Sequence, residues 1–203
     1  MDFDLMKELF PIKKPVHKLK WGIPEARFTA PIDDAEKIVS TIRKQAIFSG
    51  GGEFLEEIHF KDYGNNIYAY YILRTDKRSQ EETVHFDGYM LQEKDRIGVD
   101  VTDAGKVSRD LDNLGYVYAF NREIEVWSFR SLTRVIAVFS VTGLGDFVEV
   151  ALPETKIAKQ RDKDSTWGEK FFARLKIDPK DIIPTDLITL QLVSMQQPQE
   201  PKA

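Results

Sequence analysis

Short runs in which apolar and polar residues alternate dominate the chain. The run over residues 23–30 places Ala26, Phe28 and Ala30 on one face and charged or polar residues on the other. Residues 54–61 alternate in the same way. An alternation with a period of two residues is typical of a strand with two unlike faces. The same pattern predicts further strands over residues 67–75, 83–90, 116–129, 133–141 and 146–152.

Between these strands, apolar residues recur at helical spacing in a few windows. Asp33 and Glu36 fit a capping box at the start of the first window, and the glycine run 50–52 is expected to follow the end of this helix. Pro184 is expected to open the last helix. Residues 155–164 fit either a loop or the start of a helix. The predicted helices cover residues 35–46, 103–114, 167–175 and 182–192.

Charged residues on one face of several strands fit two architectures. The more frequent one is an antiparallel sheet with one solvated face. The other is a barrel in which the charges line a tunnel and the apolar faces pack outward against helices. The predicted helices are interspersed among the strands and carry apolar stripes that must be buried, which favours the second architecture. We therefore expect an α+β fold with an antiparallel, closed or nearly closed β-barrel and helices on its outside.

Composition narrows the function classes. The 203 residues are 42% hydrophobic and carry a formal net charge of −4, which provides for a core and argues against a nucleic-acid coat. The absence of cysteine excludes disulfides, thiol nucleophiles and cysteine-bound zinc. No apolar run approaches the length of a membrane span, and the acidic N-terminus does not resemble a secretory signal. We expect a cytoplasmic protein without a membrane partner.

Breaks in the pattern divide the chain into three parts. Pro11 and Pro15 interrupt the start, so residues 1–20 are predicted to be an N-terminal extension. Residues 21–193 are predicted to form a single domain, and residues 194–203 a disordered tail.

The segment 144–151, LGDFVEVA, resembles the late strand pair of the CYTH superfamily, the triphosphate tunnel proteins. This superfamily includes class IV adenylyl cyclases, thiamine triphosphatases and inorganic triphosphatases. The resemblance extends over about residues 21–190 through the order of the elements and through four other motif positions, at residues 24–29, 73–74, 113–127 and 171–187.

The resemblance implies a tunnel that binds a small phosphorylated ligand, and an enzyme that hydrolyses or cyclises a triphosphate with Mg²⁺ or Mn²⁺. Glu25 and Glu149 match the catalytic and metal-binding carboxylates, and Glu57 is a substitute ligand. A homodimer is left open. The residues in line to bind phosphate are Arg27, Lys61, Arg74 and Arg122.

Departures from the family pattern support an alternative, in which the fold is kept as a catalytically inactive binding or scaffold protein with a degenerate metal site. Arg27 stands where the family has a carboxylate, and Thr29 where it has a lysine. Ser140 and Ala151 stand where the family has two further acids. Arg27 would bind phosphate directly, or pair with Glu25 or Glu149, and it would repel a cation.

Two histidines add a third possibility, an enzyme with relocated catalytic residues. Glu57, His59 and Lys61 share one strand face and are expected to point inward, as orienter, base and phosphate ligand or as a structural network. His85 shares a face with Asp87, as a base with its orienter, a metal pair, or a structural pair.

Overall fold

The computed structural model describes residues 26–62, 68–88, 98–100, 104–132, 134–152 and 158–196. The predicted N-terminal extension and Glu25 lie outside the described residues, as do residues 197–203. The strands are β1 (Ala26–Ile32), β2 (Ile47–Asp62), β3 (Tyr68–Asp76), β4 (Glu82–Gly88), β5 (Gly98–Asp100), β6 (Val117–Ser131), β7 (Arg134–Val141) and β8 (Gly145–Leu152). The helices are α2 (Ala35–Ile42), α3 (Ala104–Asn113), α4 (Ala158–Arg174), a short 3₁₀ turn (Pro179–Asp181) and α5 (Leu187–Gln196).

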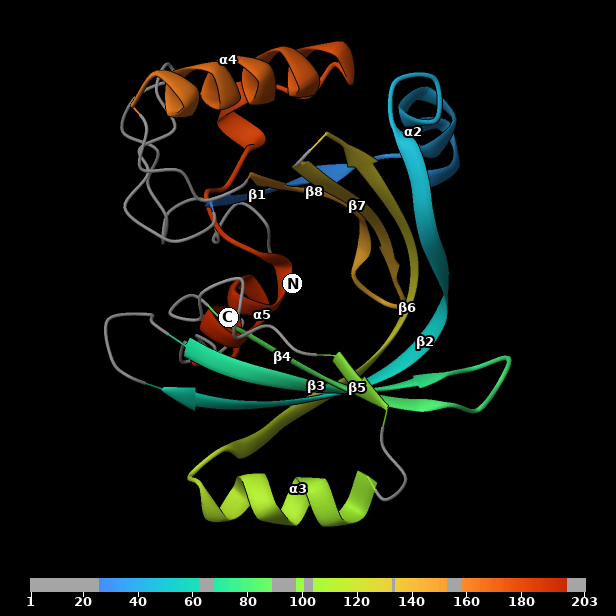
Figure 1. Ribbon diagram of the computed structural model, residues 1–203, viewed down its shortest axis with the longest axis vertical. Helices are drawn as coiled ribbons and strands as arrows, with labels where there is room; N and C mark the ends of the chain where they lie inside the picture. Colours follow the sequence, from blue (N-terminus) through green and yellow to red (C-terminus); the bar gives the residue numbers. More distant parts are fainter. Residues whose placement is uncertain are drawn as a thin grey trace, which may run out of the picture.

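All eight strands form one antiparallel sheet in the order β1-β8-β7-β6-β2-β3-β4-β5. The long strands β2 and β6 run through both halves of the sheet, and the halves curve towards each other (Figure 1). Strands β1 and β5 are its edges, and no described residues pair them. The predicted α+β fold with a nearly closed, tunnel-like antiparallel sheet is thus confirmed.

The glycine run 50–52 lies within β2 instead of following a helix end, so that expectation was wrong. A Cβ on Gly51 would come within 2.3 Å of the carbonyl oxygen of Val126 on β6. Gly50 has a φ of +151°, at a bulge in the pairing of β2 with β6. Glycine is therefore required here for the close approach of two strands.

Two details of the helix caps also differ from expectation. Helix α2 is capped by Asp34, whose side chain accepts a hydrogen bond from Lys37 N at 2.9 Å, instead of by Asp33. Helix α5 begins at Leu187, after the capping residue Asp186, instead of at Pro184. Both helices are capped by carboxylates; the cap of α2 lies one residue later than expected, and α5 begins three residues later than expected.

One apolar core lies on the outer side of β1, β7 and β8, beneath α2 and α4 (Figure 1). It confirms the expected packing of helices on the outside of the sheet. Its fully buried members include Phe28, Ile42, Phe129, Ile136 and Val150.

Helix α5 lies on the inner side, between the two halves of the sheet (Figure 1). Ile188 and Leu192 pack with Ile58 and Tyr70 of β2 and β3, and Leu187 packs with residues of β6, β7 and β8. The residues from Leu187 to Val193 are all buried, as expected for a helix that is apolar on every side. The interior is therefore partly filled by the last helix.

Candidate functional site

Three arginines from three strands meet at one small pocket on the inner side of the sheet. Arg27 comes from β1, Arg74 from β3 and Arg122 from β6. The pocket has a volume of about 110 Å³. The other residues that line it are Tyr70, Ile72, Phe139, Glu149, Asp186, Leu187 and Ile188. Four of the residues that the sequence motifs selected, the three arginines and Glu149, are thus brought together.

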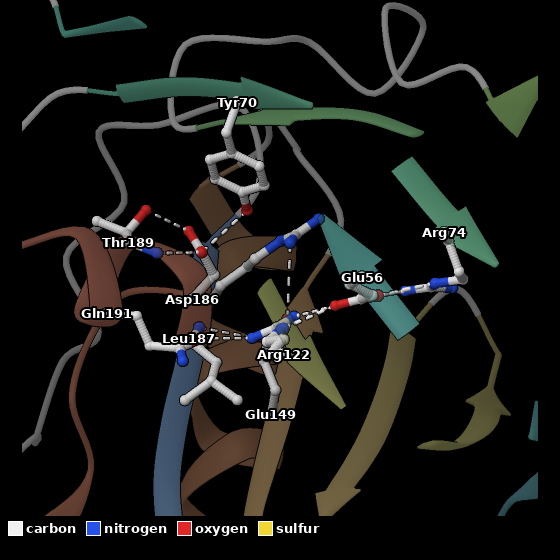
Figure 2. Close-up of polar contacts among 10 residues, drawn as sticks. Glu56, Tyr70, Arg74, Arg122, Glu149, Asp186, Leu187, Thr189 and Gln191 are labelled. Atoms are coloured by element: carbon white, nitrogen blue, oxygen red, sulfur yellow. Dashed lines mark hydrogen bonds and ion pairs between the residues drawn. The ribbon is translucent and has the colours of Figure 1, made fainter. Parts of the chain in front are cut away.

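Glu56 of β2 stands between two of these arginines. It lies directly opposite Arg74 on one neighbouring strand and directly opposite Arg122 on the other. Arg74 Nε donates to Glu56 Oε1 at 2.7 Å, and Arg122 Nε donates to Glu56 Oε2 at 2.7 Å (Figure 2). Arg122 also donates through Nη1 to Gln191 of α5 at 2.5 Å. This row across three strands holds both guanidinium groups in place.

Glu56 has no exposed surface. Burial alone would raise the pKa of its carboxyl group, but the positive charges and hydrogen bonds of Arg122 and Arg74 outweigh this effect and lower the pKa below its ordinary value. Glu56 was not among the predicted site residues because it falls in the apolar phase of β2, with Phe54 and Ile58. An acid in an apolar phase was the signal that could have found it.

Glu149 of β8 joins the other wall of the pocket to α5. Its Oε1 lies 3.6 Å from Arg27 Nη1, and its Oε2 accepts hydrogen bonds from Leu187 N at 3.1 Å and from the Thr29 hydroxyl at 3.4 Å. The carboxylate thus binds β1 and the first turn of α5 at once.

Asp186 fixes the start of α5 against β3. Its carboxylate accepts hydrogen bonds from Thr189 N and the Thr189 hydroxyl, both at 2.8 Å, and from the Tyr70 hydroxyl at 2.9 Å (Figure 2). Together with Glu56 and Glu149, it gives three carboxylates at or directly behind the pocket, against three arginines. The positive and negative charges of the described side chains at the pocket are therefore equal in number.

The described residues do not fit a divalent ion at this position. Such an ion needs carboxylate oxygens with a surplus of negative charge. Arg27 places a guanidinium beside Glu149, whose oxygens already accept two hydrogen bonds. No cluster of three or more metal-ligating side chains occurs among the described residues. Glu25, the other expected ligand, lies outside them.

The expected inward trio does not reach the pocket, so its placement is corrected. Lys61 Nζ donates to the carbonyl oxygen of Leu114 at 2.8 Å, and His59 Nδ1 lies 3.4 Å from a carboxylate oxygen of Asp112 in α3. His59 Nε2 also pairs with Glu57. These three side chains lie on the outer face of β2, under α3, because Glu56 and Ile58 occupy the inner face.

Aromatic rings complete this outer cluster. His59 stacks on Tyr71 with ring centroids 4.5 Å apart. Burial raises the pKa of the Tyr71 hydroxyl to about 12. The negative charges of Asp112 and Glu57 also raise this pKa, whereas a hydrogen bond with Ser108 lowers it. Such a network of buried rings and ion pairs is typical of a structural contact. His85 lies on β4 opposite Ile72, but its side chain is outside the described part of the chain.

Comparison with known proteins identifies the fold. No family model and no curated protein matches the sequence. Among solved structures, the PH1819 protein of Pyrococcus horikoshii shares 19% identity at a TM-score of 0.61, covering 84% of this chain and 99% of that one. A conserved hypothetical protein of Pyrococcus furiosus shares 18% identity at a TM-score of 0.60, with 82% and 99% covered.

A third solved structure carries a functional name. It is a Vibrio parahaemolyticus protein provisionally named an adenylate cyclase, with 14% identity, a TM-score of 0.57, and coverage of 85% of this chain and 99% of that one. The chain has the fold of the triphosphate tunnel, or CYTH, proteins, as its motifs predicted. Within the described residues, none of the helices is both long and apolar enough to span a bilayer.

Proposed function

We propose that this protein binds a phosphorylated small molecule at the pocket of Arg27, Arg74 and Arg122, and that it does so without a divalent ion. The observation that carries the proposal is the convergence of three arginines from separate strands on one partly enclosed pocket. The provisional name of the Vibrio parahaemolyticus protein, an adenylate cyclase, implies a phosphorylated substrate for a protein of the same fold and supports this class of ligand.

The chemistry of the arginines supports an anionic ligand. A guanidinium presents five N–H donors in a plane that matches phosphate oxygens. Arg27 and Arg74 keep 18% and 23% of their side-chain surface exposed, so a ligand can reach them, whereas Arg122 at 5% serves as the inner wall. Contacts with a phosphate in this partly enclosed site are stronger than in water, because the surroundings are less polar.

The proposal does not include hydrolysis. In this arrangement Arg27 takes the place that the family motif gives to a carboxylate, and Glu149 is bound to Arg27, Thr29 and the backbone of α5. The roles of Glu25 and Glu149 as metal-binding, catalytic carboxylates stay predictions from the sequence. An assay with Mg²⁺ or Mn²⁺ on nucleoside triphosphates, tripolyphosphate and thiamine triphosphate tests them, and we expect rates at background.

The second candidate function is a scaffold in which the pocket holds no ligand. One observation favours it: Arg27, Arg74 and Arg122 each already contact a carboxylate of the chain. An entering phosphate must compete with these internal partners, so binding is expected to be weaker than at an arginine cluster without them.

Thermal unfolding in the presence of anions separates the two functions. Orthophosphate and a simple phosphomonoester should raise the unfolding temperature with EDTA present, and the shift should grow with concentration, because a ligand that binds only the folded state stabilises it. Arg74→Gln should reduce the shift, whereas Arg130→Gln, an exposed arginine on β6, should not. The absence of any shift with either anion would favour the scaffold.

A further inference from the structure

Glu56 controls how much positive charge the pocket can offer. It lies opposite both Arg74 and Arg122 and hydrogen-bonds to each of them. One buried carboxylate is therefore shared by two of the three arginines that line the pocket. Because Glu56 has no exposed surface, water screens its negative charge less than it screens a charge at the surface.

The other two carboxylates, Glu149 and Asp186, also hold the start of helix α5. Glu149 and Asp186 accept hydrogen bonds from backbone N–H groups at the start of α5, at Leu187 and Thr189. Their charge is therefore used to hold the helix. The hydrogen bonds that Glu56 accepts come from the two pocket arginines, so its effect is directed at the pocket.

The volume of the pocket sets a second limit. Its 110 Å³ is smaller than the cavity of about 150 Å³ that holds a benzene molecule in another protein. A single phosphate group fits within such a space, whereas a chain of three would extend beyond it. Charge and volume thus point to the same class of ligand.

We infer that Glu56 is a specificity-determining residue, which restricts the pocket to a ligand with a single phosphate group, such as orthophosphate or a phosphomonoester, and disfavours polyphosphates. The inference rests on the proposed function and narrows its ligand class. A tripolyphosphate carries several more negative charges than the balanced pocket can offset. Replacing Glu56 by a neutral residue releases two guanidinium groups for such a ligand.

Isothermal titration with orthophosphate and with tripolyphosphate, in EDTA, tests this inference on three proteins. The unmodified protein should bind tripolyphosphate no more tightly than orthophosphate. Glu56→Gln should bind tripolyphosphate at least about tenfold more tightly than the unmodified protein does, the magnitude of one charged hydrogen bond. Glu53→Gln, which removes the same charge from an exposed position three residues earlier on β2, should change neither affinity.

The neutral variant leaves two arginines without their shared counter-ion and can fail to fold. Recovery of its folded state on adding tripolyphosphate, followed by circular dichroism, would then support the inference. If Glu56→Gln stays unfolded with both anions, the test rests on the relative affinities of the unmodified protein for the two anions. Tighter binding of tripolyphosphate than of orthophosphate overturns the inference.

The failures of the two proposals look different. If the unmodified protein binds both anions and prefers tripolyphosphate, the proposed function stands and the role of Glu56 falls. The same holds if folded Glu56→Gln binds tripolyphosphate no more tightly than the unmodified protein does. If neither the unmodified protein nor the variant binds either anion, the proposed function itself is wrong.

Discussion

Arg27 Nη1 lies 3.6 Å from Glu149 Oε1, across the neighbouring strands β1 and β8. The sequence motif that Arg27 interrupts would place a carboxylate at this point, beside the carboxylate of Glu149. The exchange replaces a pair of negative charges by an ion pair. An ion pair holds a divalent cation less well than two carboxylates do, so this one residue bears on the class of ligand that we propose.

This relationship predicts that a metal site can be restored. In Arg27→Glu, two carboxylates face each other and repel unless a cation lies between them. We expect Mn²⁺ binding in this variant, measured by titration calorimetry, at least about tenfold tighter than in the unmodified protein. Arg27→Gln removes the positive charge without adding a ligand and is the control. Equal Mn²⁺ affinity in all three proteins would show that Arg27 does not decide metal binding.

Removal of Glu56 should destabilise the fold strongly. Glu56→Ala leaves Arg122 buried with Gln191 as its described partner and takes away the ion pair of Arg74. Loss of one member of a buried charge cluster is expected to lower the free energy of unfolding by about 3–5 kcal/mol. Urea denaturation measures this change. Glu123→Ala, an exposed glutamate on β6, should change it by less than about 0.5 kcal/mol. Comparable losses in both variants would contradict the structural role of Glu56.

The lowered pKa of Glu56 predicts a dependence of stability on pH. In the unfolded chain this carboxyl group takes up a proton near its ordinary value of 4.5, and in the folded protein only at lower pH. In this interval the unfolded state binds more protons, so the free energy of unfolding falls as the pH falls below the ordinary value. Its contribution is fully present at neutral pH.

As the pH falls from 7 to below the ordinary pKa of 4.5, the free energy of unfolding should therefore decrease less in Glu56→Gln than in the unmodified protein. Urea denaturation at a series of pH values measures both proteins, and Glu53→Gln serves as the control with an exposed carboxyl group. Parallel curves for all three proteins would show that Glu56 is not the group that titrates with folding.

Lys61 should have no part in anion binding. Its ammonium group donates to the Leu114 carbonyl on the outer side of the sheet, away from the pocket. Lys61→Ala is expected to leave orthophosphate affinity unchanged in titration calorimetry, whereas Arg74→Gln should weaken it about tenfold. A loss of affinity in Lys61→Ala equal to that in Arg74→Gln would move the binding site to the outer face.

Most of the strands could be predicted because a period of two residues assigns side chains to opposite faces. The grouping of Arg27 and Arg122 on the inner surface followed from the resemblance to the tunnel proteins. The pattern could not say which face of β2 is inside, because both are covered: one by α5 and the other by α3. His59 and Lys61 were placed on the inner side for this reason.

The positions of the glycine run and of helix α5 were predicted wrongly for a different physical reason. Glycine permits both a helix end and a close strand approach, and only the partner strand, with Val126 at Gly51, decides between them. Helix α5 is apolar on every side, so its sequence predicts burial but not the surface against which it is buried.

The position of α5 along the chain also bears on the order in which the molecule can be made. All eight strands precede this helix, so a ribosome has produced the whole sheet before residues 187–196 are available to cover its inner surface. Until then Ile58, Tyr70 and Ile124 lack the cover that this helix provides, as does the charged row of Glu56. The growing chain therefore passes through a stage that is prone to aggregation, and that stage ends only when the helix emerges.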